Sequence, residues 1–106
     1  MPDNEIRQPV WTVHDLRRGE IIWLLKANYP HFVTFRHLQL ALRDRNIPVG
    51  TRDLFSYLSY LEESGFVRCE RAYCESKMQD MITTSALTAK GMLLYDRKIG
   101  DQGVRL

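Results

Sequence analysis

The stretch from Thr51 to Gly65 combines the pattern of a short helix with side chains that could bind nucleic acid. Apolar residues recur on one side at about 100° per residue, namely Leu54, Leu58 and Leu61, flanked by Phe55 and Tyr57. The other side carries Arg52, Ser56, Ser59, Tyr60 and Glu63. An arginine can bond guanine O6 and N7 with both arms of its fork, while Ser and Tyr hydroxyls can reach phosphates or bases. The stretch therefore predicts a recognition helix over 51–63 in which Arg52 is the strongest base-reading candidate.

The ends of this helix are marked by residue type. We expect the Thr51 hydroxyl to cap its N-terminus and Asp53, in the first turn, to suit the positive end of the helix dipole. Gly65 supplies the left-handed residue that ends a helix, and the β-forming Phe66 and Val67 follow at once.

Other chemistry is sparsely represented. Cys69 and Cys74 could cross-link a hairpin or join His31 or His37 at a metal, but the paired close spacings of a zinc site are missing. We expect free thiols, and solvated or capping roles for the histidines including His14. The sequence has no phosphate-cradling glycine loop, nucleophile elbow or convincing carboxylate pair, so we expect neither an enzyme nor a cofactor.

Length and composition describe a single globular domain. The chain has 106 residues, 44% hydrophobic and 26% charged, with an expected extended arm over 1–12 and a loose tail over 99–106. The N-terminus does not resemble a signal peptide, and no apolar run approaches the roughly 18 residues of a membrane span, so we expect a cytoplasmic protein.

The net charge is a weak signature for a nucleic-acid partner. It is only +2, although Arg supplies 11 of the 15 basic residues. Arginine forms forked contacts to phosphate or guanine better than lysine does. Composition therefore leaves nucleic acid open as a partner.

Hydrophobic periodicity predicts three further helices and a hairpin. Thr12 and Asp15 have the form of a capping box before a first helix from Val13 to about Asn28, which is apolar all round and so central in the fold. A short extended segment at 31–33 follows, then a second helix at 35–45 capped by Thr34, with Ile47 or Val49 filling the turn. Strands are predicted at 66–71 and 81–87 around a polar tip, and Thr88 caps a last helix at 89–98.

This order is that of an α+β, mostly helical fold with a helix-turn-helix, and two short stretches carry a family resemblance. Leu54-Phe55-Ser56-Tyr57-Leu58-Ser59-Tyr60-Leu61-Glu62-Glu63-Ser64-Gly65-Phe66-Val67 and Leu87-Thr88-Ala89-Lys90-Gly91 resemble junctions of the winged helix-turn-helix proteins of bacteria and phages. The similarity covers roughly residues 14–98. Within that family, the chain resembles a small winged-helix protein of Mu-like prophages.

The resemblance implies a three-helix core, a two-stranded wing and a C-terminal helix, and it implies functional positions. In DNA-binding members the third helix enters the major groove of double-stranded DNA, and its exposed positions match Arg52, Ser56, Ser59 and Tyr60. The wing tip, from Arg71 to Lys77, would lie near the minor groove or the backbone, and Thr34 could bond a phosphate. A transcriptional regulator acting as a homodimer through the N-terminal arm and the C-terminal helix is therefore expected.

Some residues favour a different partner. Asp53 and Glu63 lie on or beside the presumed DNA face, and Glu70, Glu75 and Asp80 balance the basic residues of the wing. Apolar or aromatic residues expected at the surface are Leu40, Phe55, Tyr57 and Tyr60. A winged-helix module that binds protein rather than DNA therefore stays open as the alternative.

Overall fold

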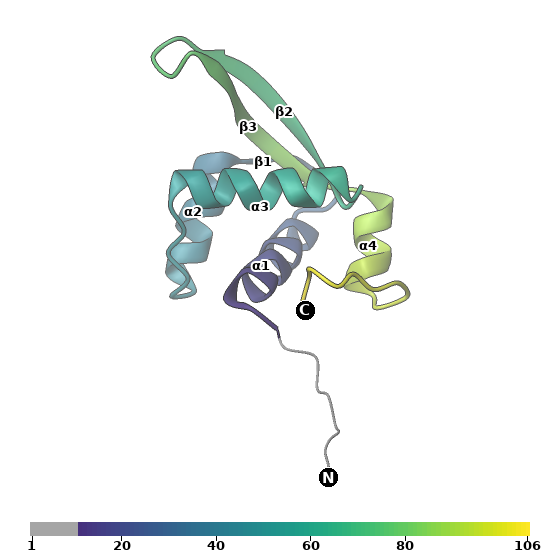
Figure 1. The fold of residues 1–106 in the computed structure, drawn as a ribbon. Coiled ribbons are helices and arrows are strands. Elements are labelled where there is room, and N and C mark those ends of the chain that lie inside the picture. Colours follow the sequence, from purple (N-terminus) through teal and green to yellow (C-terminus); the bar gives the residue numbers. More distant parts are fainter. Residues whose placement is uncertain (1–10) are drawn as a thin grey trace.

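The computed structural model describes residues 11–106, which form four helices and a three-stranded sheet (Figure 1). The elements follow in the order α1 (Val13–Ala27), β1 (Val33–Thr34), α2 (Phe35–Asp44), α3 (Thr51–Glu63), β2 (Val67–Cys74), β3 (Gln79–Leu87) and α4 (Ala89–Tyr95). The predicted α+β class and the predicted order of elements are confirmed.

The first helix begins at the predicted capping box. The Asp15 backbone N–H donates to Thr12 Oγ1 at 3.1 Å, and the Thr12 N–H donates to the Asp15 carboxylate at 2.9 Å. α1 packs against α2, α3, α4 and β3, as expected of a central helix. It is not covered all round, however, because Val13, Leu16 and Trp23 remain exposed.

The turn between α2 and α3 departs from prediction in its cap. Gly50, with an extended backbone, is the N-cap of α3, and no side chain caps the helix. Thr51 is already helical, so the predicted capping role of its hydroxyl is wrong; Thr51 Oγ1 accepts instead from the Gln39 amide at 3.4 Å. Val49 is buried and Ile47 half-buried, so both fill the turn, and Gly65 has the expected positive φ of 84°.

The sheet is antiparallel, in the order β1-β3-β2, and its long hairpin forms the wing. The hairpin pairs Val67 with Leu87 at its base and Cys74 with Gln79 near its tip, so both strands reach further into the predicted polar tip than expected. A bulge lies beside Glu70 and Arg71, where Thr83 has no partner across the ladder and donates its hydroxyl hydrogen to the Glu70 carbonyl at 3.1 Å. Figure 1 shows the wing extending beyond the helices, with its base beside α3.

The core lies between α1, the apolar faces of α2 and α3, and the base of the wing. Its side chains are almost all aliphatic, and the fully buried ones include Ile21, Ile22, Leu25, Leu42, Leu54, Leu58 and Leu61. The predicted inner face of α3, made by Leu54, Leu58 and Leu61, is confirmed.

The chain after α4 is not the loose tail that was predicted. α4 ends at Tyr95, earlier than expected, and residues 101–106, the C-terminal segment, return to pack on α1. The Arg105 N–H donates to the Asp15 carbonyl at 3.0 Å, and Val104 is only 5% exposed within the core. Val104 is a single apolar residue within a short polar stretch, so hydrophobic patterning did not predict that the segment would be packed.

Of the predicted arm, residues 1–10 lie outside the described residues. Among the helices that the structure describes, none is long and apolar enough to cross a membrane.

Candidate nucleic-acid interface

The outward face of α3 carries the predicted side chains in part. Arg52 and Ser56 are exposed, and Ser59 is half-buried on the side that faces away from the core. Glu63 is also exposed on this face, one helical repeat toward the C-terminus. A polar surface of Arg and Ser is therefore present, with an acidic residue at one end.

The first half of α3 and the wing form the two walls of a shallow groove. Thr51, Arg52 and Phe55 line it from the helix, and Lys77, Gln79 and Met81 line it from the wing. The fold thus brings Arg52 and Lys77, two predicted contact residues that are far apart in the sequence, onto one concave surface. Phe55 also lines this surface, but it is half-buried and packs against the core.

Arg71 lies elsewhere than predicted. It sits in β2 opposite Ile82 rather than at the wing tip, and its guanidinium donates two hydrogen bonds to the Glu62 carboxylate, at 2.6 and 3.0 Å. The same hydrogen bonding lowers the pKa of Glu62. Arg71 is therefore engaged in a forked ion pair that ties the wing to α3, and it does not point to the groove as an unpaired cation.

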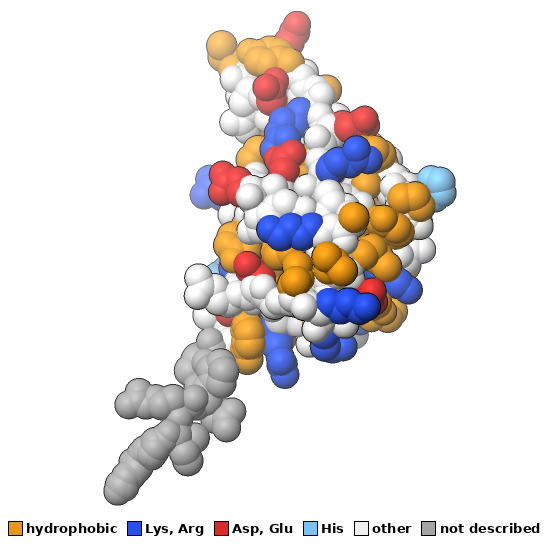
Figure 2. All heavy atoms as spheres, turned by 90° about the vertical axis from the view of Figure 1, so that its right-hand side faces the viewer, with side chains coloured by type: hydrophobic (Ala, Val, Ile, Leu, Met, Phe, Trp, Pro, Cys, Tyr) orange, Lys and Arg blue, Asp and Glu red, His pale blue; other side chains and the backbone are white. Residues whose placement is uncertain are grey.

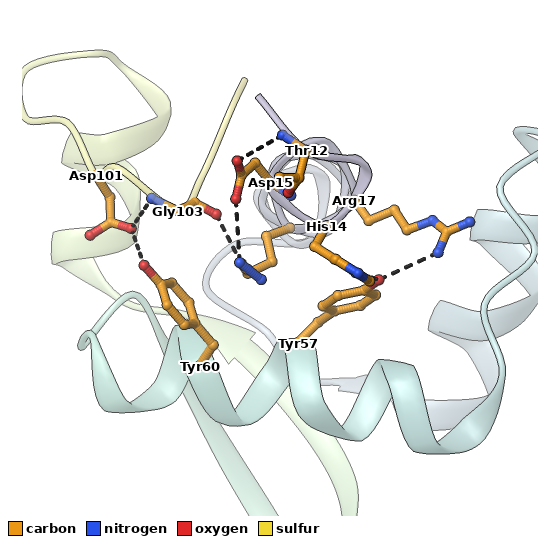
Figure 3. A network of polar contacts seen from close by, with 9 residues as sticks. Thr12, His14, Asp15, Arg17, Tyr57, Tyr60, Asp101 and Gly103 are labelled. Atoms are coloured by element: carbon orange, nitrogen blue, oxygen red, sulfur yellow. Dashed lines mark hydrogen bonds and ion pairs between the residues drawn. The ribbon is translucent and has the colours of Figure 1, made fainter. Parts of the chain in front are cut away.

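Tyr60 does not lie on the outward face, which corrects the sequence prediction (Figure 3). Its hydroxyl donates to the Asp101 carboxylate at 2.7 Å, and the Arg18 guanidinium lies over its ring at 4.2 Å from the centroid. Arg18 also donates to the Gly103 carbonyl at 2.8 Å. Tyr60 therefore joins α3 to α1 and to the C-terminal segment instead of facing a ligand.

Thr34, which was predicted to bond a phosphate, also caps a helix. Its side chain accepts the His37 backbone N–H at 3.1 Å and so caps α2 as predicted. Thr34 is exposed at the junction of β1 and α2, and its hydroxyl hydrogen is left to donate outward.

Two arginines of α2 line a surface depression but were not predicted from the sequence as contact residues. Arg36 and Arg43, seven positions apart and so on the same helix face, line a second shallow depression together with Leu40 and Gly50, beside the N-terminus of α3. Both are exposed. The spacing of two like charges by two helical turns is the signal that could have found them. Leu40, which was expected at the surface, is half-buried and belongs to this depression.

The basic residues that line these two depressions are not neutralised by ion pairs among the described residues. Among residues 11–106 three pairs form, Arg18 with Asp15, Arg45 with Glu20 and Arg71 with Glu62. None of them involves Arg36, Arg43, Arg52 or Lys77. We call these four residues the cationic track. Asp53, Glu63 and Asp80 are exposed near it and reduce its positive potential.

The cysteines do not form a site with their neighbours. Both are free thiols, and they lie five positions apart along one strand, a separation on the order of 16 Å. Burial raises the pKa of Cys69, whereas a hydrogen bond with the Ser76 hydroxyl lowers the pKa of Cys74. Within the described part of the chain no three His, Cys, Asp or Glu side chains come together as metal ligands.

Comparison with solved structures supports the fold. The chain is similar to a transcriptional regulator from Clostridium thermocellum (TM-score 0.57, 19% identity, 76% of each chain covered) and to a PadR-family transcriptional regulator from Eggerthella lenta (TM-score 0.55, 18% identity, 77% of this chain and 70% of that chain). It is also similar to a protein of Thermoplasma acidophilum assigned as a transcriptional regulator (TM-score 0.54, 24% identity, 76% of this chain and 79% of that chain). No protein-family model and no curated protein matches the sequence. At these identities the likeness shows the fold, and it agrees with the predicted winged helix.

Proposed function

We propose that this protein binds double-stranded DNA, with α3 in the major groove and the wing against the adjacent backbone, and that it regulates transcription. The observation that carries the proposal is the groove shared by Arg52 of α3 and Lys77 of the wing. A helix of this width enters the major groove of B-form DNA, and a cation on a flanking hairpin is then positioned to meet a phosphate.

The cationic track supports the same orientation. Arg36 and Arg43 lie beside the N-terminus of α3, where no side-chain cap occupies the first backbone N–H groups. Phosphate oxygens are favoured at such a helix end by the N–H donors and by the helix dipole. The proposed division of roles gives Arg52 the base edge, with Ser56 and Ser59 beside it, and gives Arg36, Arg43, Lys77 and Thr34 the backbone.

A binding assay with labelled duplex DNA tests the proposal directly. Fluorescence anisotropy with a random-sequence duplex in low salt is expected to give micromolar binding that weakens steeply as salt rises, because counterions are released from the phosphates. The fold must be verified by circular dichroism in the same buffer. Absence of binding by folded protein at tens of micromolar would falsify the proposed function.

Replacement of the Arg52 side chain distinguishes recognition of a base from sequence-independent attraction to the DNA phosphates. Arg52→Ala is expected to cost roughly 1–3 kcal/mol on a selected DNA site and to relax the sequence preference at the contacted base pair. Arg68→Ala is the matched control. Arg68 is exposed on β2 and follows the buried Val67, so its side chain points to the face of the sheet away from the core, where it lies over Phe32. Equal losses in the two variants would contradict the role given to α3.

One observation favours a protein partner as the second candidate function. The wing tip exposes two large apolar side chains, Tyr73 at 60% and Met78 at 79%, together with the acidic Glu75 and Asp80. The other residues expected to form such a surface do not, because Tyr57 is buried while Leu40, Phe55 and Tyr60 are half-buried. This function is selected if the folded protein has no affinity for DNA and a partner protein protects its wing tip.

Two finer assignments belong to the proposal. A homodimer suits a regulator because a two-fold protein reads a two-fold DNA site. Kinship with small winged-helix proteins of Mu-like prophages stays a prediction from the sequence resemblance, since none of the three similar structures is described as a phage protein.

A further inference from the structure

We propose that the DNA site of this protein contains a thymine close to the guanine that Arg52 reads, and that Phe55 and Met81 recognise its C5-methyl group. The inference rests on the proposed DNA binding and deepens it, because it names a base that the protein selects. Both residues line the groove between α3 and the wing. Neither was predicted from the sequence to contact DNA.

The groove combines an apolar surface with unpaired positive charge. Phe55 lines it from α3 and Met81 from the wing, and each is half-buried, so each keeps part of its side chain at the surface. Arg52 and Lys77, one from each wall, belong to the cationic track and form no ion pair among the described residues. A ligand that matches this surface carries negative charge and also presents an apolar group.

Local geometry directs both apolar side chains into the groove. Phe55 follows Arg52 by three positions, so the two share one side of α3. Met81 follows Gln79 by two positions on β3, so both face the same side of the wing, and the Gln79 amide donates to the Met81 sulfur at 3.4 Å. The forked ion pair of Arg71 ties the wing to α3, so the spacing of the two walls is held before DNA binds.

Thymine is the base whose chemistry matches such an apolar surface. In the major groove its C5-methyl group is the apolar group that distinguishes one base pair from another, whereas the other distinguishing groups are hydrogen-bond donors and acceptors. A donor or acceptor placed against Phe55 and Met81 would lose its water without gaining a partner. The deoxyribose is also partly apolar, but contact with it carries no sequence information. A sequence-reading role for this surface therefore points to thymine.

Helix geometry sets the distance from the guanine. Three residues along an α-helix advance about 4.5 Å, and base pairs follow each other at about 3.4 Å along DNA. With α3 lying along the major groove, Phe55 is therefore one to two base-pair steps from Arg52. The thymine is expected within two base pairs of the guanine, on either strand.

Other exposed apolar side chains provide matched controls. Met78, at the wing tip, is 79% exposed but does not line the groove. Figure 2 shows the side of the molecule that carries α4, where hydrophobic side chains gather below the wing with Lys and Arg side chains among them. Leu93 of α4 is 43% exposed, and Figure 1 places α4 near the C-terminal end of α3, whereas the groove lies beside its first half.

Selection from two random duplex libraries, one made with thymidine and one with deoxyuridine in its place, tests the inference. Deoxyuridine lacks only the C5-methyl group and keeps the hydrogen-bonding groups, sugar and phosphate. The wild type is expected to enrich thymine at one fixed position of the first library and to show no preference for uracil at that position of the second. The guanine read by Arg52 should be enriched in both. Equal enrichment of thymine and uracil overturns the inference.

Fluorescence anisotropy with one selected duplex measures the contact. Replacing the single thymine by uracil is expected to weaken wild-type binding roughly three- to fivefold, the effect of one methyl group no longer buried. In Met81→Ala this ratio should fall below about twofold, while Met78→Ala and Leu93→Ala keep the wild-type ratio. Met81 is chosen over Phe55 because Phe55 also packs against the core. A wild-type ratio near one, or a ratio that Met81→Ala leaves unchanged, contradicts the recognition of thymine.

These outcomes separate the inference from the proposed function. DNA binding that shows no sequence preference, or that does not distinguish thymine from uracil, overturns the inference and leaves the proposed DNA binding intact. Failure of the folded protein to bind either library overturns both. Circular dichroism of each variant in the binding buffer verifies that it is folded.

Discussion

Tyr57 and Tyr60, three residues apart on α3, both turn their hydroxyl groups toward the body of the protein. Tyr57 is only 4% exposed, and its hydroxyl hydrogen-bonds His14 Nδ1 at 2.6 Å. Arg17 donates to the same hydroxyl at a longer 3.4 Å. Figure 3 shows Tyr57 beside His14 and Arg17 of α1, and Tyr60 next to Asp101 of the C-terminal segment. Both tyrosines thus hold α3 in place, and the side of α3 that faces solvent carries Arg52, Ser56 and Ser59.

Loss of the Tyr60 hydroxyl is expected to lower stability in a pH-dependent way. The hydrogen bond to the Asp101 carboxylate is the main reason that the pKa of Tyr60 is raised above its ordinary value of 10.0. A raised pKa in the folded state means that the stabilisation is complete below about pH 10 and is lost as the pH rises through that pKa. Tyr60→Phe should therefore cost about 1 kcal/mol in urea unfolding at pH 7, and less at pH 11.

Comparison with a charge-neutral acceptor checks the cause. Asp101→Asn keeps a side-chain oxygen near the hydroxyl but removes the negative charge, so tyrosine absorbance at alkaline pH should titrate earlier than in the wild type. An unchanged titration in Asp101→Asn would show that the carboxylate is not the cause of the raised pKa.

The C-terminal segment crosses α1 and α3 only where glycine leaves room. A Cβ at Gly19 would lie 1.8 Å from the Arg105 carbonyl oxygen, and a Cβ at Gly103 would lie 2.1 Å from the Tyr60 hydroxyl oxygen. The first obstacle is backbone, which cannot move without lifting the segment from α1. These close approaches, rather than backbone conformation, explain the need for glycine at both positions.

Alanine at these positions is expected to destabilise the protein. Gly19→Ala and Gly103→Ala should each cost roughly 1–3 kcal/mol in thermal or urea unfolding, because overpacking displaces the segment. For Gly19 this is the opposite of the gain of up to about 1 kcal/mol that alanine brings to an unobstructed helix position. Gly100→Ala is the control, since nothing lies within 4 Å of its added Cβ. A Gly19→Ala variant as stable as wild type would mean that the segment is not held against α1.

The wing illustrates how far element boundaries could be predicted. Its base was recognised because Val67, Ile82 and Leu87 are β-forming and buried on one face. The outer part was assigned to a loop because residues 72–80 are polar, yet backbone pairing continues to Cys74 and Gln79. Inter-strand hydrogen bonds need no apolar side chains, so hydrophobic patterning cannot detect where an exposed hairpin ends.

At the scale of the whole molecule, the net charge is small, so the positions of individual charges matter more than their sum. The net charge of +2 gives little overall attraction to DNA. Ion pairs neutralise Arg18, Arg45 and Arg71, while the four residues of the cationic track stay unpaired among the described residues. Affinity for DNA should therefore depend on a few local contacts.

The salt dependence of DNA binding measures how many contacts form. Three phosphates neutralised by Arg36, Arg43 and Lys77 predict a slope of log K against log salt of about −2.7, at about −0.9 per contact. Replacing Arg36 and Arg43 together by alanine should reduce the magnitude of the slope by about 2, because two contacts are lost. Arg68→Ala should leave it unchanged. An unaltered slope in the Arg36/Arg43 double variant would remove α2 from the proposed interface.

The sequence by itself determined the helices, their caps at Thr12, Thr34 and Thr88, the buried face of α3 and its exit at Gly65, because these follow from periodicity and local backbone chemistry. It also determined that Arg52 faces outward. Only the tertiary structure decided which charges are paired, where Tyr60 points, and that residues 101–106 are anchored. Those outcomes depend on contacts between residues far apart in the chain, such as Tyr60 with Asp101 and Arg18 with Gly103, and local patterns carry no record of them.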